Sequence, residues 1–203
     1  MLFRSKSVLM EADISRIGPG IPEKEKIVPQ KPDTVLVKAA INGDAESFTE
    51  LAQRYYPAMV AIAHSILGDR HLAEDAAQQA FAKAALKLPQ LKKENRFAHW
   101  LAVICRNAAR DMARRAENLN VAEDLSSIAA RSDRDDKTDA VRQALERLSA
   151  PAREVIFLRF YDGMSYEQMS AVLGISEQAI SGRLRRAKRK MADYLRRNGF
   201  GEV

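Results

Sequence analysis

The sequence predicts an all-α protein made of two small helical domains joined by a flexible linker. The composition favours helix over sheet, because aromatic residues make up only 6% of the chain and glycine only 9 of its 203 residues. From residue 33 onward, apolar residues recur at intervals of three and four, which is the period of an amphipathic helix. This period is lost over residues 117–137, where six acidic residues accompany three basic ones, so we expect the linker there.

The N-terminal segment and the overall charge indicate where the protein acts and what kind of partner it binds. Residues 1–32 hold four of the seven prolines and are expected to form a disordered leader. The chain has neither a secretory signal nor about 18 consecutive apolar residues, so we expect a cytoplasmic protein that does not enter a membrane. Its formal net charge of +6 is a weak indication of an anionic partner.

Residues 33–116 are expected to form the first domain, a bundle of four helices. A kink or a new start is expected at Pro57, inside the second helical pattern. The fourth helix is expected from Phe97 to about Arg115, with Trp100 on its apolar side. The first three helices each begin at an aspartate that can cap a helix N-terminus, namely Asp33, Asp44 and Asp69.

Residues 138–203 are expected to form the second domain. It begins with a helix capped by Thr138, followed by one that carries Pro151 in its first turn and stops at Asp162-Gly163. A capping box at Ser165 then starts a short helix. Its last residues are followed by a glycine turn and by a long helix that Ser176 caps and that runs to about Arg197. Two capped helices joined by a tight turn predict a helix-turn-helix motif.

The last helix of this motif has two distinct faces when it is projected at 100° per residue. One face is apolar and expected to be buried: Ile180, Leu184, Ala187 and Met191. The opposite face and its flanks carry polar and basic residues, and residues 183–197 include eight basic residues but one acid. Exposed guanidiniums and amides near a helix N-terminus suit the DNA major groove. The expected DNA contacts are Gln178, Ser181, Gly182, Arg183, Arg185, Arg186 and Arg189.

Both halves of the chain then resemble one protein family. The second half contains LERLSAPAREVIFLRFYDGMSYEQMSAVLGIS and RLRRAKRKM, which resemble region 4 of bacterial RNA polymerase sigma factors. The first half contains AESFTELAQRYYPAMVAIAHSILGDRHLAEDAAQQAF and FAHWLAVICRNAARDMARR, which resemble region 2. Two such regions with no domain between them are similar to the extracytoplasmic-function (ECF) subfamily of sigma-70 factors. The resemblance covers residues 33–198.

The resemblance implies a protein that directs core RNA polymerase to promoters without being an enzyme and without a cofactor. Region 4 would contact the −35 element and the β flap, region 2 would dock on the β′ clamp helices, and an anti-sigma factor would regulate the chain. The docking residues would be a polar row: Asp75, Gln78, Gln79 and Ala82. Gln79 departs from the family, which usually has an acid there, and Ser181-Gly182 replaces the usual basic residue and serine.

The resemblance also places the melted −10 strand against the fourth helix of region 2 and the loop before it. Asparagine offers a donor and an acceptor to a base edge, and arginine offers phosphate contacts and stacking. The expected −10 contacts are Asn95, Arg96, Phe97, Arg106, Asn107, Arg110, Asp111 and Arg114. Phe97 and Trp100 are also at core spacing, so a purely structural role stays open for both.

Two other classes of protein stay open on the residues alone. A stand-alone helix-turn-helix regulator with an N-terminal helical sensor domain would bind DNA without polymerase, usually as a symmetric dimer. A helical interaction module would show no salt-sensitive affinity for DNA. Catalytic and metal sites are not expected, because the three histidines lack metal-ligand spacing with one another or with Cys105, which is expected to be a buried thiol.

Overall fold

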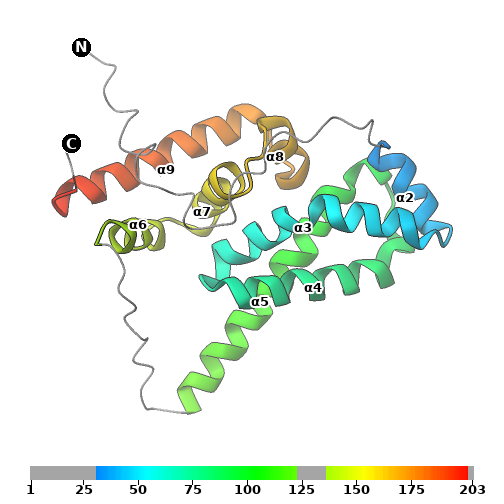
Figure 1. Ribbon diagram of the computed structural model, residues 1–203, viewed down its shortest axis with the longest axis horizontal. Helices are drawn as coiled ribbons and strands as arrows, with labels where there is room; N and C mark the ends of the chain where they lie inside the picture. Colours follow the sequence, from blue (N-terminus) through cyan, green and yellow to red (C-terminus); the bar gives the residue numbers. More distant parts are fainter. Residues whose placement is uncertain (1–30, 123–135, 201–203) are drawn as a thin grey trace.

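The computed structural model describes residues 31–122 and 136–200, and these residues form helices without any strand (Figure 1). The predicted all-α class is therefore confirmed. The first bundle contains α2 (Asp33–Ile41), α3 (Ala45–Leu67), α4 (Arg70–Lys87) and α5 (Phe97–Ala122), with the short 3-10 helices η2 (Leu88–Gln90) and η3 (Glu94–Arg96) between the last two. The second bundle contains α6 (Asp136–Glu146), α7 (Ala150–Ile156), the π-helix η4 (Phe157–Tyr161), α8 (Tyr166–Leu173) and α9 (Glu177–Arg197).

Two of the three predicted aspartate caps in the first bundle are confirmed. The Asp44 carboxylate accepts hydrogen bonds from the backbone N–H groups of Glu46 and Ser47, and that of Asp69 accepts one from Leu72. The prediction for Asp33 is wrong, because Pro32 occupies the cap position of α2 and Asp33 is the first helical residue. Its carboxylate instead accepts hydrogen bonds from Arg54 and Tyr55 on α3 and so joins the two helices.

Helix α3 continues without a new start through Pro57. A proline inside a helix removes one backbone hydrogen bond and favours a break. Here the six residues that follow it, 58–63, are all buried in the core, and Pro57 itself is exposed. The apolar contacts of Met59, Val60 and Ile62 outweigh the lost hydrogen bond, since burying a side chain of this size stabilises the fold by about 1.5–3 kcal/mol.

The helices on both sides of the predicted linker are longer than expected. Helix α5 ends at Ala122 rather than near Arg115, because residues 116–122 contain neither glycine nor proline and acidity alone does not end a helix. In Figure 1 its C-terminal end extends beyond the bundle. Helix α6 begins at Asp136, so Thr138 lies within the helix and is not its cap. The rest of the linker, 123–135, lies outside the described residues, as does the leader up to residue 30.

The two bundles pack directly against each other. Helices α3 and α5 contact α7, η4 and α8, and the buried apolar residues of both bundles form one continuous core. This packing differs from the expectation of two separate bodies on a linker. The sequence could not indicate it, because every contact joins residues that are far apart in the chain. None of the described helices is both long and apolar enough to span a membrane.

A half-buried carboxyl group directly after η4, that of Asp162, makes stability depend on pH. Burial raises the pKa of Asp162 from 3.8 to about 7. The folded state therefore binds the Asp162 proton more tightly than the unfolded state does. The contribution of Asp162 to stability is fully present below about pH 4 and is lost as the pH rises through about 7. We expect Asp162→Asn to raise the free energy of unfolding more at pH 8 than at pH 5, by on the order of 1 kcal/mol after allowance for solvent access. Urea unfolding at both pH values measures this, and equal gains would contradict it.

Candidate nucleic-acid interface

The helix-turn-helix motif has the geometry that its sequence predicts. The side chain of Ser165 and that of Gln168 form a reciprocal capping box at the start of α8. Gly174 ends α8 with a φ of +70°, a left-handed conformation that favours glycine. The Ser176 hydroxyl then accepts a hydrogen bond from the Ala179 N–H and starts α9. The turn therefore fixes the direction of α9 relative to α8.

Helix α9 presents its basic and polar face to solvent. The predicted stripe is confirmed, since Ile180, Leu184, Ala187 and Met191 are all buried, together with Leu195. On the other side five of the predicted DNA contacts are exposed: Gln178, Ser181, Arg185, Arg186 and Arg189. The remaining two, Gly182 and Arg183, are half-buried. The exposed row begins within the first turn of α9, so its amide and guanidinium groups can reach base edges and phosphates along one groove.

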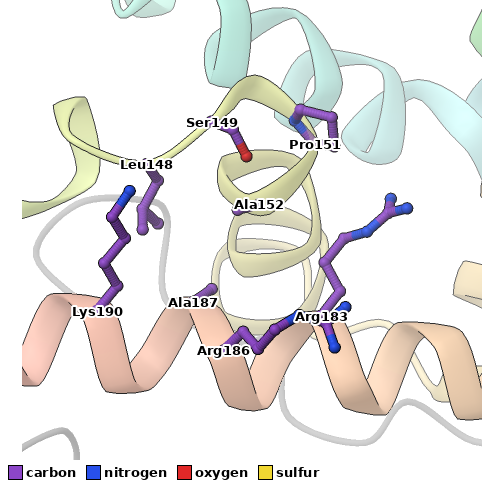
Figure 2. A pocket seen from close by; sticks show the side chains of 8 residues that line it. All are labelled: Leu148, Ser149, Pro151, Ala152, Arg183, Arg186, Ala187 and Lys190. Atoms are coloured by element: carbon purple, nitrogen blue, oxygen red, sulfur yellow. The ribbon is translucent and has the colours of Figure 1, made fainter.

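A basic hollow lies beside this exposed row, between the start of α7 and the middle of α9. Figure 2 shows the side chains that line it. The volume of the hollow is about 250 Å³. Its basic wall consists of Arg183, Arg186 and Lys190, opposite Pro151 on α7 and Ser149 just before that helix. Lys190 was not among the expected DNA contacts, although its place in the basic run was a signal for it. The three cations extend the positive surface from the exposed row of α9 onto its flank, and such a surface can bind phosphate groups.

Gly182 occupies a helical position that does not require glycine. It is not among the glycines with positive φ, and a Cβ added there would lie 3.4 Å from the nearest guanidinium nitrogen of Arg186, an ordinary contact. Because glycine costs about 1 kcal/mol relative to alanine inside a helix, we expect Gly182→Ala to raise the free energy of unfolding by about that amount. Urea unfolding measures the change. A decrease in the free energy of unfolding would instead show that a side chain at position 182 strains the helix.

The polar row on α4 is exposed as predicted. Asp75, Gln78, Gln79 and Ala82 all face solvent, whereas Ala76, Ala80 and Ala84 are buried against the rest of the bundle. Small side chains on the inner face bring α4 close to α3 and α5, which it contacts along its length. The row is thus held on a rigid helix with one acidic and two amide side chains available to a partner.

The predicted −10 contacts are divided by the structure into exposed and covered residues. Six are exposed: Asn95 and Arg96 before α5, and Asn107, Arg110, Asp111 and Arg114 on it. Phe97 is 1% exposed and packs against Tyr55 and Trp100, so its prediction as a DNA contact is wrong and its ring belongs to the core. The Arg106 guanidinium forms an ion pair with Glu154 of α7, with Nε and Oε1 2.7 Å apart.

Cys105 is the buried thiol that the sequence predicts. It donates a hydrogen bond to the Met59 carbonyl over 3.3 Å, and burial raises its pKa to about 12. A thiol with this pKa stays protonated at neutral pH and is a poor nucleophile. Within residues 31–122 and 136–200, no three His, Cys, Asp or Glu side chains are grouped so that they could hold a metal ion.

Comparison with protein-family models places both helical bundles in one family. The model for sigma-70 region 2 matches residues 51–118, and the model for sigma-70 region 4 matches residues 138–191. The two matches coincide with the bundle that carries α4 and α5 and with the bundle that carries the helix-turn-helix motif.

Individual relatives agree with the family models. CnrH from Cupriavidus metallidurans, an RNA polymerase sigma factor, is 30% identical over 183 residues, which cover 82% of this chain and 96% of CnrH. RfaY from Xanthomonas campestris pv. campestris, named a probable RNA polymerase sigma factor, is 29% identical over 168 residues. That match covers 77% of this chain, and the chain spans 42% of the length of RfaY.

Two solved structures are also similar. CnrH in complex with the cytosolic domain of CnrY has a TM-score of 0.55 at 30% identity, covering 80% of this chain and 96% of that chain. The sigma factor RpoE from Bartonella quintana, in complex with the anti-sigma factor NepR, has a TM-score of 0.50 at 26% identity, covering 75% of this chain and 98% of that chain.

Proposed function

Since this chain belongs to the sigma-70 family of RNA polymerase sigma factors, in its ECF group, we propose that its two domains contact successive elements of a promoter while the first is docked on polymerase. Residues 33–116 form the domain that binds polymerase and the −10 element, and residues 138–203 form the domain that binds the −35 element. The protein acts in the cytoplasm, where bacterial RNA polymerase transcribes the genome.

The observation that carries the proposal is the exposed face of α9. Its arginines and its amide side chain are solvent-accessible on a helix whose opposite face is buried, immediately after a tight turn. Arginine can bind guanine O6 and N7 with two hydrogen bonds, and glutamine can bind adenine N6 and N7 in the same way. Helix α9 therefore lies in the major groove of the −35 duplex, with Arg183 and Lys190 on the flanking phosphates.

The −10 element is held as a single strand by α5 and the residues before it. Asn107 and Asp111 lie one turn apart on α5, and Arg110 and Arg114 supply positive charge beside them. Asparagine can bind the exposed edge of an unpaired base, and arginine can bind the phosphates or stack on the bases. Promoter melting is driven by the binding free energy of these bases, without nucleotide hydrolysis.

Docking on the polymerase uses the exposed row of α4. Its carboxylate and amide groups can pair with basic and polar groups of the β′ clamp helices. The second domain contacts the β flap. An anti-sigma factor regulates this chain, which is supported by the similar RpoE structure, where the sigma factor is in complex with the anti-sigma factor NepR.

In vitro transcription on a library of genomic fragments tests this function. Core RNA polymerase from the source bacterium is incubated with and without the purified chain, and transcript starts are mapped by sequencing. We expect new starts that share two sequence elements upstream. Specific binding to DNA by a dimer of the chain without polymerase would instead indicate a stand-alone regulator, and the absence of salt-sensitive DNA affinity would indicate an interaction module.

A further inference from the structure

The interface between the two domains is closely fitted at the helix-turn-helix turn. The Nδ1 atom of His99 on α5 lies 3.2 Å from the Val172 carbonyl oxygen on α8. A Cβ atom at Gly174 would lie only 2.7 Å from two atoms of the His99 ring. Glycine is therefore needed at 174 both for its positive φ and for this close approach to the first domain.

Aromatic rings continue the interface on α3. The His64 ring packs edge-on against Phe157 with ring centroids 4.8 Å apart, and against Tyr161 at 6.0 Å. Both partners belong to η4, the π-helix that ends α7. Irregular turns of this kind often occur at functional sites, because they redirect the side chains of the helix. Here the turn brings two rings onto the first domain.

An ion pair lies within this interface and includes Arg106, one of the predicted −10 contacts. The side chains of Arg106 and Glu154 are only 14% and 11% exposed, and their Nε and Oε1 atoms are 2.7 Å apart. The other basic side chains of α5 near it, Arg110 and Arg114, are exposed. Of the arginines assigned to the −10 strand, Arg106 is thus the one whose guanidinium is covered by the second domain.

We propose that Glu154 is an intramolecular competitor of the promoter −10 strand. This inference rests on the proposed function. In the free chain the Glu154 carboxylate occupies the Arg106 guanidinium, which would otherwise bind a DNA phosphate. Carboxylate and phosphate oxygens are alternative partners for the same guanidinium donors. A phosphate of the melted strand can bind Arg106 only after the second domain has moved away from α5.

The energetics of a covered ion pair suit such an exchange. The attraction between the two charges is largely offset by the cost of removing both from water, so the pair adds little net stability to the closed form. Breaking it without a replacement leaves a charged group without its partner and is costly. Replacement of Glu154 by phosphate keeps Arg106 paired and returns the carboxylate to water.

The closed form leaves the other binding surfaces accessible. The polar row of α4 and the basic face of α9 are exposed while Arg106 is covered. Polymerase docking on α4 therefore requires no separation of the domains. Capture of the −10 strand does require it, so the free chain binds single-stranded DNA weakly and gains this activity once the domains separate.

Single-strand binding by the free chain tests the competition. The probe is a fluorescent oligonucleotide carrying the non-template −10 strand of a promoter selected with the wild-type holoenzyme. We expect Glu154→Gln to tighten binding about tenfold, because the variant lacks the charge that holds the Arg106 guanidinium in the closed form. Glu146→Gln removes the same charge at an exposed position of the second domain and is expected to leave binding near the wild-type value.

A double variant separates the competition from a general effect of charge. In the Arg106→Gln background, Glu154→Gln is expected to give no gain, because the guanidinium it would release is absent. A gain that persists in this background, or none in Glu154→Gln alone, would overturn the proposal. If Glu154→Gln does not fold, the swap Arg106→Glu with Glu154→Arg is used instead. It is expected to retain a compact particle in small-angle X-ray scattering and to bind the strand no better than wild type, and tighter binding would contradict the competition.

Different results distinguish an error in the proposed function from an error in the competition between Glu154 and the −10 strand. If the proposed function is wrong, the wild-type chain directs no transcripts from core polymerase. If only the competition is wrong, the wild-type chain directs transcription but the free Glu154→Gln chain binds the oligonucleotide like wild type.

Discussion

The variant Asp75→Arg is expected to abolish promoter-specific transcription in a reaction with core polymerase. Asp75 is exposed on α4 and carries the acidic charge of the polar row. Asp75 is the one carboxylate of a row that otherwise holds Gln78, Gln79 and Ala82, so reversal there removes this charge and places a cation against the basic groups with which the row is proposed to pair. Like charges facing each other across an interface cost several kcal/mol, so holoenzyme formation is expected to weaken about 100-fold.

The measurement combines transcript yield with co-elution of the chain and core polymerase on size exclusion. Circular dichroism and the unfolding midpoint verify that the variant is folded. Glu146→Arg, the same change of charge at an exposed position on α6, is the matched control and is expected to retain transcription. Full activity of Asp75→Arg would exclude the α4 row as the docking surface.

Replacement of Arg185 by alanine is expected to reduce transcription from the selected promoters by about tenfold or more. Arg185 is exposed on the predicted recognition face of α9, on the side away from the buried stripe of this helix. Loss of an arginine that binds a guanine with two hydrogen bonds costs about 1–3 kcal/mol. The loss is expected to be largest at promoters with the guanine that Arg185 contacts and to be small at promoters that lack it.

Arg197→Ala is the matched control, because it removes the same charge at the exposed end of α9, away from the recognition face. Gel-shift titrations of the −35 duplex at several salt concentrations separate base recognition from phosphate binding. A uniform decrease at all sequences for Arg185→Ala, equal to that of the control, would show that Arg185 contacts only phosphate.

Local patterns predicted most of the DNA-binding domain. The capping box at Ser165 and the cap at Ser176 are formed by residues three positions apart, and the stripe from Ile180 to Met191 follows from the helical period alone. The exposure of the α4 row was predictable for the same reason. One error occurred where distant side chains recruit a residue expected to cap a helix: Asp33 binds Arg54 and Tyr55 instead of capping α2.

Whether an individual residue of α5 is buried or exposed depends on residues that are far from it in the sequence. The sequence placed Phe97 both on the apolar stripe and beside the −10 contacts, and its packing against Tyr55 decides for the core. Arg106 carries the same sequence signal as Arg110, yet only Arg106 meets a carboxylate, which comes from a residue 48 positions later.

The helical period, the caps at Ser165 and Ser176 and the exposure of the basic face of α9 are therefore properties of the chain alone, because they depend on side chains within one or two turns of each other. The union of the two domains into one core, the fit of Gly174 to His99 and the covering of Arg106 arise only in the folded molecule. Those contacts join segments separated by tens of residues, and which distant surfaces meet is decided by the shape and charge of whole helices packed together.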